Sequence, residues 1–154
     1  MALETLFAGR EMDLAEMMFG LKKTAADLNL PMGERRKTYN SRLAQETGKW
    51  AEARGRGKAF HQAVFHAYFA EGRNIGRTAN LIRLAVRAGL PEDEAREVLE
   101  GRTFREAVDE DWSRALRMGI TAVPTFVMDH QRVVGAQPYE HLAAWMKAMH
   151  VEKC

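Results

Sequence analysis

"GITAVPTFVMDHQRVVGAQP", residues 119–138, is the stretch of sequence that decides the fold. It predicts two short strands, 125–128 and 132–134, joined by a turn at 129–131. Pro124 stands directly before the first strand, although proline cannot donate a hydrogen bond to a β-ladder. The stretch therefore predicts a β-hairpin whose entry is set by a proline.

Before and after this hairpin the apolar residues recur at helical spacing. Asp13, followed by Glu16, has the pattern of a capping box, Asn40 is a suitable N-cap for the next helix, and Thr78 is an N-cap candidate further along. We expect helices that begin near these positions: Asp13, Asn40, Gly57, Thr78, Pro91, Phe104 and Pro138. The sequence therefore predicts a mainly α chain with a small β-hairpin, of the α+β class.

The order of these elements suggests two regions without a linker between them. Residues 1–118 form a helical region, and residues 119–154 contain the hairpin and a closing helix. We find no internal repeat or low-complexity tract that would separate the regions. We expect the two regions to form one globular unit, which 154 residues are long enough to build.

The charge balance excludes several classes of protein. The chain has 23 basic and 21 acidic residues, so its formal net charge is only +2. This balance is unlike that of a nucleic-acid-binding or membrane-surface protein. No apolar run approaches the roughly 20 residues of a membrane span, and the first seven residues lack the pattern of a signal peptide. We therefore expect a cytoplasmic protein.

The residues that usually carry chemistry are sparse. Cys154 is the only cysteine, so the 154 residues contain no C-x-x-C pair and no internal disulfide. His61 and His66 are five positions apart, about 140° around a helix, which does not suit a shared metal. The acidic runs 92–94 and 109–111 fit helix ends and solvent. We expect no catalytic residue, no metal ligand and no cofactor in this chain.

Three segments carry a resemblance to a known family. They are "YNSRLAQETGKWAEARGRGKAFHQAVFHAYFAEGRNIG" (39–76), "AREVLE" (95–100) and the hairpin stretch quoted above. Together they resemble the DsbA-like family, specifically its FrnE-type members, and the similarity extends from about Leu3 to Met146. The resemblance implies a helical insert within a thioredoxin-like fold, of which residues 119–154 are the C-terminal half.

The resemblance also implies a ligand-binding loop. In that family the bond between Val123 and Pro124 is cis, which exposes the backbone of Val123 along an open edge. An extended peptide or glutathione can pair with that edge, so Val123, Pro124 and Thr125 are the candidate binding residues. Asn40 is a fourth candidate, because in related glutathione-dependent isomerases an asparagine near this junction lines the cleft.

One feature of the family is not found in these residues. DsbA-like proteins carry a C-x-x-C motif, or a serine variant, at the start of a helix that precedes the helical insert. We expect this strand–helix–strand unit to be missing here, and we therefore interpret the chain as a redox-silent binding or scaffold module. Two alternatives stay open: the C-terminal portion of an active DsbA-like disulfide oxidoreductase, and a glutathione-dependent isomerase-like protein.

The predicted hairpin also bears on the oligomeric state. A hairpin alone is marginal in water, and its two edges would expose Phe126, Val127, Val133 and Val134. We expect a homodimer in which two copies cover these edges, because closed two-fold symmetry is the usual solution.

Overall fold

The computed structural model describes residues 1–6, 13–34 and 36–151. Contacts between Cα atoms divide the chain into two compact units, Met1–Asp109 and Glu110–Cys154. The first unit ends at Asp109, within a helix, whereas the first region was expected to end nine residues later, at residue 118. That the two regions form one globular unit stays a prediction.

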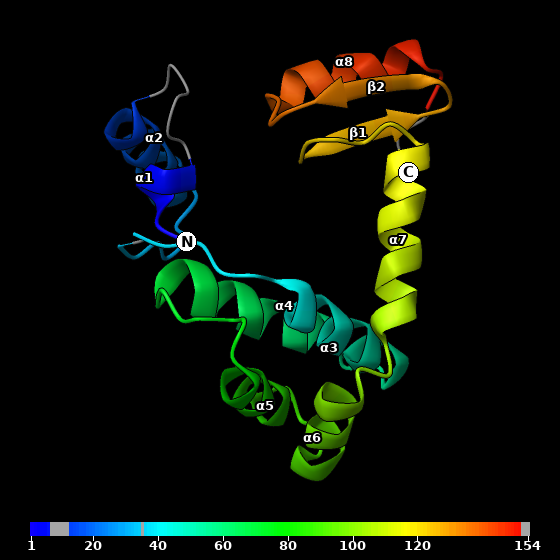
Figure 1. Ribbon diagram of the computed structural model, residues 1–154. Coiled ribbons are helices and arrows are strands. Elements are labelled where there is room, and N and C mark those ends of the chain that lie inside the picture. The colour runs from blue at the N-terminus through cyan, green and yellow to red at the C-terminus, as the bar shows by residue number, and fades with distance from the viewer. Residues whose placement is uncertain (7–12, 35, 152–154) are drawn as a thin grey trace. The chain divides into compact units, whose positions relative to one another are not determined.

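The elements follow the order expected from the sequence (Figure 1). They are α1 (Leu3–Leu6), α2 (Leu14–Asp27), α3 (Arg42–Ala53), α4 (Gly57–Phe65), the π-helical turn η1 (His66–Ala70), α5 (Thr78–Arg87), α6 (Glu92–Gly101), α7 (Arg105–Arg117), β1 (Thr125–Met128), β2 (Gln131–Val134) and α8 (Tyr139–Ala148). The predicted fold class, mainly α with one small hairpin, is confirmed.

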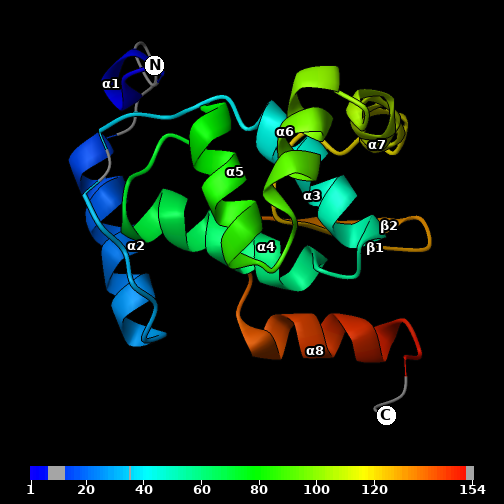
Figure 2. The same ribbon diagram turned by 90° about the horizontal axis from the view of Figure 1, so that it is seen from below.

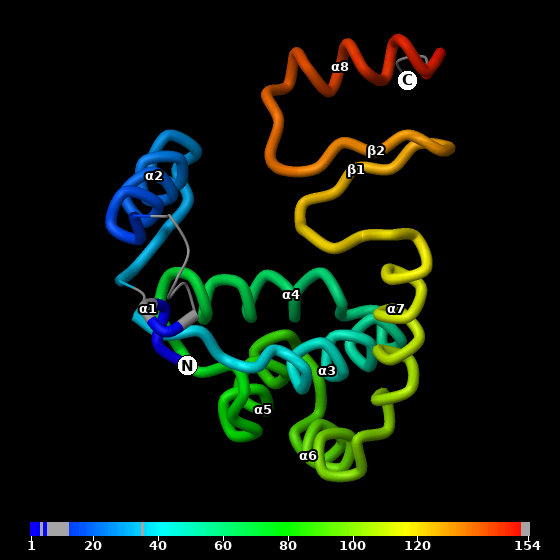
Figure 3. Tube along the Cα trace, turned by 45° about the horizontal axis from the view of Figure 1, so that its top comes forward, coloured from blue at the N-terminus to red at the C-terminus, as the bar shows by residue number. Residues whose placement is uncertain are grey.

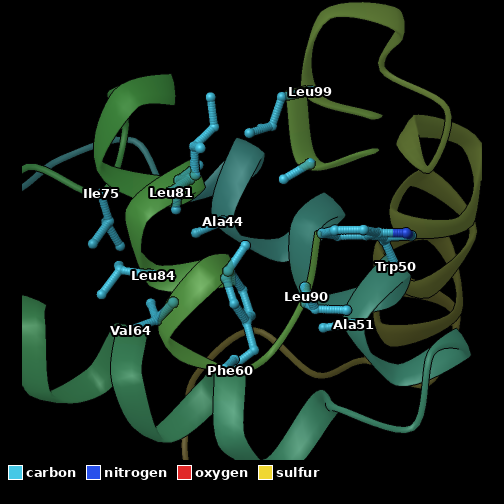
Figure 4. Close-up of a cluster of buried hydrophobic side chains, with 14 of the residues drawn as sticks. Ala44, Trp50, Ala51, Phe60, Val64, Ile75, Leu81, Leu84, Leu90 and Leu99 are labelled. Carbon is cyan, nitrogen blue, oxygen red and sulfur yellow. The ribbon is translucent and has the colours of Figure 1, made fainter. Parts of the chain in front are cut away.

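The hydrophobic core of the first unit lies among α3, α4, α5 and α6, which pack against one another (Figure 2). Phe60 of α4 and Leu81 of α5 are completely buried at its centre (Figure 4). Burying each such side chain contributes about 1.5–3 kcal/mol. The other members are Ala44, Trp50, Ala51, Val64, Ala67, Ile75, Ile82, Leu84, Ala85, Ala88, Leu90, Ala95 and Leu99. The apolar spacing read from the sequence thus identifies the buried faces of these helices.

The helix starts show which sequence signals were used. Asp13 Oδ1 accepts hydrogen bonds from the backbone N–H groups of Ala15 at 2.8 Å and Glu16 at 3.3 Å. Asn40 Oδ1 accepts one from the N–H of Arg42, at 2.8 Å, at the start of α3. The N-cap predicted at Asp13 is therefore confirmed, whereas the N-cap of α3 is Ser41 and Asn40 stands one position before it. Thr78 is likewise the first residue of α5 and not its N-cap, which is Arg77.

The segment before α3 is tied back to the N-terminus. An isolated antiparallel bridge joins Ala2 to Lys37, and the N–H of Leu3 donates to the carbonyl of Arg36 at 3.0 Å. Figure 3 shows the chain leaving α2 and running past α1 before it enters α3. Leu3 is buried, so the short helix α1, which the sequence did not predict, contributes an apolar side chain to the first unit.

The second unit consists of the end of α7, the hairpin and α8. The strands are antiparallel, with Phe126 opposite Val133 and Met128 opposite Gln131. The turn therefore contains two residues and not the three predicted, because Gln131 is already paired. Trp145 Nε1 of α8 donates a hydrogen bond to Gln131 Oε1 at 3.2 Å, and α8 runs alongside the hairpin (Figures 1 and 2).

A buried carboxylate joins α3 to the end of α6. Glu46 of α3 is 2% exposed. It accepts hydrogen bonds from Arg102 Nε and Nη2, each at 2.6 Å, and from Arg42 Nε at 3.0 Å. Arg42 also pairs with Asp109 of α7. The hydrogen bonds from Arg102, aided by those from Arg42, hold the pKa of the Glu46 carboxyl below its ordinary value.

This lowered pKa predicts how stability depends on pH. Because the folded chain holds the Glu46 proton less tightly than the unfolded chain, the carboxylate stabilises the fold fully above the unfolded pKa of about 4.3 and loses that contribution as the pH falls through the lower folded pKa. Glu46→Gln should lower the free energy of unfolding at pH 7 by about 2 kcal/mol. Urea unfolding followed by circular dichroism measures this, and the difference from the parent should shrink near pH 3.

The matched control is Glu97→Gln, which removes an exposed carboxylate from α6. It should change stability by less than about 0.5 kcal/mol at either pH. Equal effects of the two substitutions at pH 7 would contradict the role given to Glu46.

Candidate functional site

The loop before β1 has its backbone exposed and both of its sides anchored. The bond between Val123 and Pro124 is cis, and the side chain of Val123 is 88% exposed. Thr125 Oγ1 donates a hydrogen bond to the carbonyl of Ala122 at 2.6 Å, and the N–H of Gly135 donates to the carbonyl of Pro124 at 2.8 Å. The first bond tightens the loop, and the second joins it to the end of β2. The loop is thus held open toward solvent by its own neighbours.

The register of the hairpin determines which backbone groups of β1 face outward. In an antiparallel ladder, alternate residue pairs exchange hydrogen bonds, and the residues between them direct their N–H and C=O groups away. The bond from Gly135 to Pro124 and the two-residue turn after Met128 fix this alternation. The backbone groups of Thr125 and Val127 therefore point away from β2, along the outer edge of β1. Such an edge can accept an extended chain as a further strand.

The other side of the hairpin is tied to the end of α7. Arg132 Nη1 donates a hydrogen bond to the carbonyl of Gly119 at 2.8 Å. Gly119 has a φ of 67°, a conformation that favours glycine, and it ends α7 with the left-handed geometry common at helix C-termini. A Cβ at this position would lie 2.6 Å from Arg132 Nη1. The glycine and the arginine together therefore set where the loop begins.

The four candidate binding residues fall into two groups. Val123, Pro124 and Thr125 are consecutive in the second unit and form the entry to the outer edge of β1. Asn40 belongs to the first unit, where its Oδ1 accepts a hydrogen bond from the Arg42 N–H just before α3 and its carbonyl lies 3.1 Å from where a Cβ on Gly76 would stand. Its role beside a ligand stays a prediction.

The histidines have separate carboxylate partners. His61 Nε2 is 3.0 Å from Glu52 Oε1, and His66 Nδ1 is 3.1 Å from Glu71 Oε1. Within residues 1–6, 13–34 and 36–151, no group of three His, Cys, Asp or Glu side chains is placed to hold a metal ion. Over the same residues, no helix is both long and apolar enough to cross a membrane. Cys154 lies outside the described residues.

Sequence reasoning missed two participants in this region. The first is Val127, whose backbone groups point outward. This follows from the register of the hairpin, which was predicted wrongly because the turn was expected to contain three residues. Arg132 was read only as a strand residue, and nothing in its neighbourhood in the sequence indicates its bond to Gly119. The exact turn length after Met128 is the signal that would have identified the outward residues of β1.

The geometry at Gly119 leads to a prediction. Gly119→Ala should destabilise the second unit by about 1–2 kcal/mol, because it places a side chain at positive φ and against the Arg132 guanidinium. Hydrogen exchange of the β1 and β2 amides measures this as faster exchange. Gly101→Ala is the matched control, since its Cβ would make an ordinary 3.5 Å contact with Thr103. Equal exchange in the two variants would refute the role of Gly119.

Comparisons with known proteins bear on the family and the fold of the chain. The family model for the DSBA-like thioredoxin domain matches residues 8–147. The uncharacterized protein YwbO of Bacillus subtilis (strain 168) is 34% identical over 95 residues, which are 61% of this chain and 48% of YwbO. The chain therefore spans about half the length of that curated relative.

Two solved structures are similar in fold. The crystal structure of a probable DsbA oxidoreductase from Streptomyces coelicolor has a TM-score of 0.81 and 29% identity, over 98% of this chain and 68% of that one. A 2-hydroxychromene-2-carboxylate isomerase has a TM-score of 0.72 and 20% identity, over 89% and 66% of the two chains. At that identity the isomerase supports the fold alone. The expected FrnE-type assignment within the family stays a prediction. The chain belongs to the DSBA-like thioredoxin domain family.

Proposed function

We propose that this chain binds extended peptide segments along the outer edge of β1, with Val123, Pro124 and Thr125 at the entry. The observation that carries the proposal is the pair of outward-facing residues, Thr125 and Val127, that follows an exposed loop. Backbone hydrogen bonds from a ligand strand would satisfy these groups without regard to the ligand's side chains. Glutathione, which is itself a small peptide, is a possible ligand of the same edge in this proposal.

The 154 residues contain no cysteine pair, which limits the redox chemistry proposed for them. Thiol–disulfide exchange needs an attacking thiolate and, in dithiol enzymes, a resolving thiol. The 154 residues contain one cysteine, Cys154. We therefore propose that these residues bind peptides but carry out no dithiol chemistry alone.

An edge-specific substitution tests the proposed binding. Val127→Pro removes an outward N–H group and, because that group does not face β2, breaks no hydrogen bond within the hairpin. Binding to a reduced and carboxymethylated lactalbumin, which stays unfolded and has no free thiol, should weaken about fivefold or more. Fluorescence anisotropy of the labelled lactalbumin gives the dissociation constants.

Val134→Pro provides the matched control for that substitution. Val134 lies opposite Thr125, so its outward N–H faces the other edge, that of β2. This variant should bind the unfolded protein as the parent does. Equal weakening by both variants would point to a damaged hairpin, and unchanged binding by Val127→Pro would refute the proposal.

We also propose that a second copy associates through the same edge. In support, the hairpin exposes Val127 at 41% and Val134 at 52%, and a two-stranded sheet is marginal without further pairing. Sedimentation velocity on the two proline variants decides the question. Val127→Pro should be the more monomeric of the two, and a parent chain that stays monomeric at high concentration would remove the dimer from the proposal.

A second candidate function is that of a disulfide oxidoreductase to which these residues contribute the peptide-binding part. The 29% identical neighbour is described as a probable DsbA oxidoreductase, and this chain covers 68% of it. The expected outcome for the 154 residues alone is no insulin reduction above background with dithiothreitol as the reductant. Turnover by this chain would overturn the view that it is redox-silent.

A further inference from the structure

We propose that the first unit contains a binding pocket for a small uncharged aromatic molecule with one hydrogen-bonding oxygen. The pocket has a volume of about 470 Å³ and lies between α2, the connector after it, and the helix α4 with its turn η1. It is independent of the β1 edge, which belongs to the second unit. Its lining is Leu21, Thr24, Ala25, Leu28, Leu30, Pro31, Met32, Gln62, Phe65, His66 and Phe69.

The walls of the pocket are apolar and keep apolar side chains in contact with water. Leu28 is 63% exposed, Leu30 58% and Phe65 59%. The pocket volume is within the range of small-molecule sites, about 300–1,000 Å³. None of the lining residues is Asp, Glu, Lys or Arg. An apolar, uncharged molecule would therefore bind here without leaving a buried charge unpaired.

Aromatic side chains indicate the shape of that molecule. The rings of Phe65 and Phe69 have centroids 6.3 Å apart and an interplanar angle of 39°. Aromatic pairs are favourable at centroid separations of 4.5–7 Å, so a further ring can pack against this wall. A flat molecule of one or two rings fits these contacts better than a flexible chain.

Two polar side chains on the same wall can bind one oxygen. His66 Nδ1 is engaged by Glu71, and Nε2 has no hydrogen-bond partner among the described residues. Gln62, one helical turn earlier on α4, lies in the same lining and offers both a donor and an acceptor. A hydroxyl or carbonyl on the ligand would therefore be fixed at this end of the pocket.

The backbone around the pocket has two uncommon features, a π-helical turn and a close approach at a glycine. The turn η1, His66–Ala70, is π-helical, and π-helical turns are frequently found at functional sites. The connector is fixed against it, because the N–H of Gly33 donates to the carbonyl of Phe69 at 2.9 Å. A Cβ on Gly33 would lie 2.2 Å from the carbonyl oxygen of Ala70. Only glycine allows this close approach, which brings the connector to the pocket wall.

The charges that flank the pocket argue against a protein occupant. Lys22, next to Leu21 in the chain, pairs with Glu34, and Glu71, which is hydrogen-bonded to His66, pairs with Arg73. A partner protein or a second copy would have to desolvate these ion pairs to reach the apolar lining. A small molecule would leave them in water.

A matched pair of substitutions tests the pocket with N-phenyl-1-naphthylamine, an uncharged probe whose fluorescence increases in apolar surroundings. Ala25→Trp fills the lining, whereas Ala26→Trp places the same side chain on the adjacent exposed position of α2. The parent chain and Ala26→Trp should bind one probe per chain. Ala25→Trp should bind at least tenfold more weakly. Gln62→Trp fills the pocket from the exposed side of α4 and should do the same if Ala25→Trp does not fold.

Competition by two small molecules tests the polar end. In the parent chain 2-naphthol should displace the probe at least threefold better than naphthalene, and His66→Phe should reduce that ratio toward one. Equal probe binding in both tryptophan variants, one probe per two chains, or no binding at all would overturn the proposal. A naphthol preference unchanged by His66→Phe would overturn the assignment of the hydrogen-bonding end.

Discussion

The backbone of β1 must find hydrogen-bond partners on both of its edges, and this constraint governs the second unit. β2 satisfies one edge, through the pairing of Phe126 with Val133 and Met128 with Gln131. The groups of Thr125 and Val127 on the other edge face water or a further chain. A backbone group that is hydrogen-bonded to water in the free protein can exchange that water for a ligand strand at little cost in free energy. The outer edge of β1 can therefore bind a strand without rearrangement of the hairpin.

Local hydrogen bonds fix the position of the loop that leads into β1. Arg132 joins the hairpin to Gly119, Gly135 joins the end of β2 to Pro124, and Thr125 closes the loop onto Ala122. Each of these bonds lies within the second unit. The first unit has its own core around Phe60 and its own buried ion network at Glu46. The chain therefore combines a well-packed helical unit with a small unit in which the described residues form a two-stranded sheet.

Local patterns were enough to predict most of the fold. Apolar spacing identified the buried faces of α3, α4, α5 and α6, because burial depends on which side chains recur at 3.6 residues. The apolar residues of α2 and α8, in contrast, are not buried. The cap at Asp13 was predicted because a side chain two or three residues from a free N–H decides it, whereas the N-cap of α3 was predicted one residue too early, at Asn40 and not at Ser41. Thr78 was misassigned since arginine at position 77 can precede a helix without capping it. The π-helical turn His66–Ala70 was not predicted, and its Phe69 carbonyl accepts a hydrogen bond from the distant Gly33 N–H.

The site was predictable only in part, for a similar reason. Val123, Pro124 and Thr125 were proposed through a resemblance; Thr125 begins β1 and the other two directly precede it, and their binding role stays a prediction. The outward position of Val127 depends on whether the turn has two residues or three. A change of one residue in the turn exchanges the residues of β1 whose backbone groups face β2 with those whose groups face outward. For Asn40, the hydrogen bond that its side chain accepts from the Arg42 N–H explains the residue without a ligand. The pocket beside η1 could not be predicted, since its walls come from three separate segments.

Site-resolved amide hydrogen exchange, measured with and without a saturating unfolded peptide, tests the central claim most directly. If the ligand adds a strand to β1, exchange at Thr125 and Val127 slows in the complex, while exchange at Arg132 and Val134 is unchanged. Slower exchange at Arg132 and Val134, or no change at any of the four amides in a complex shown to be saturated, would contradict the account.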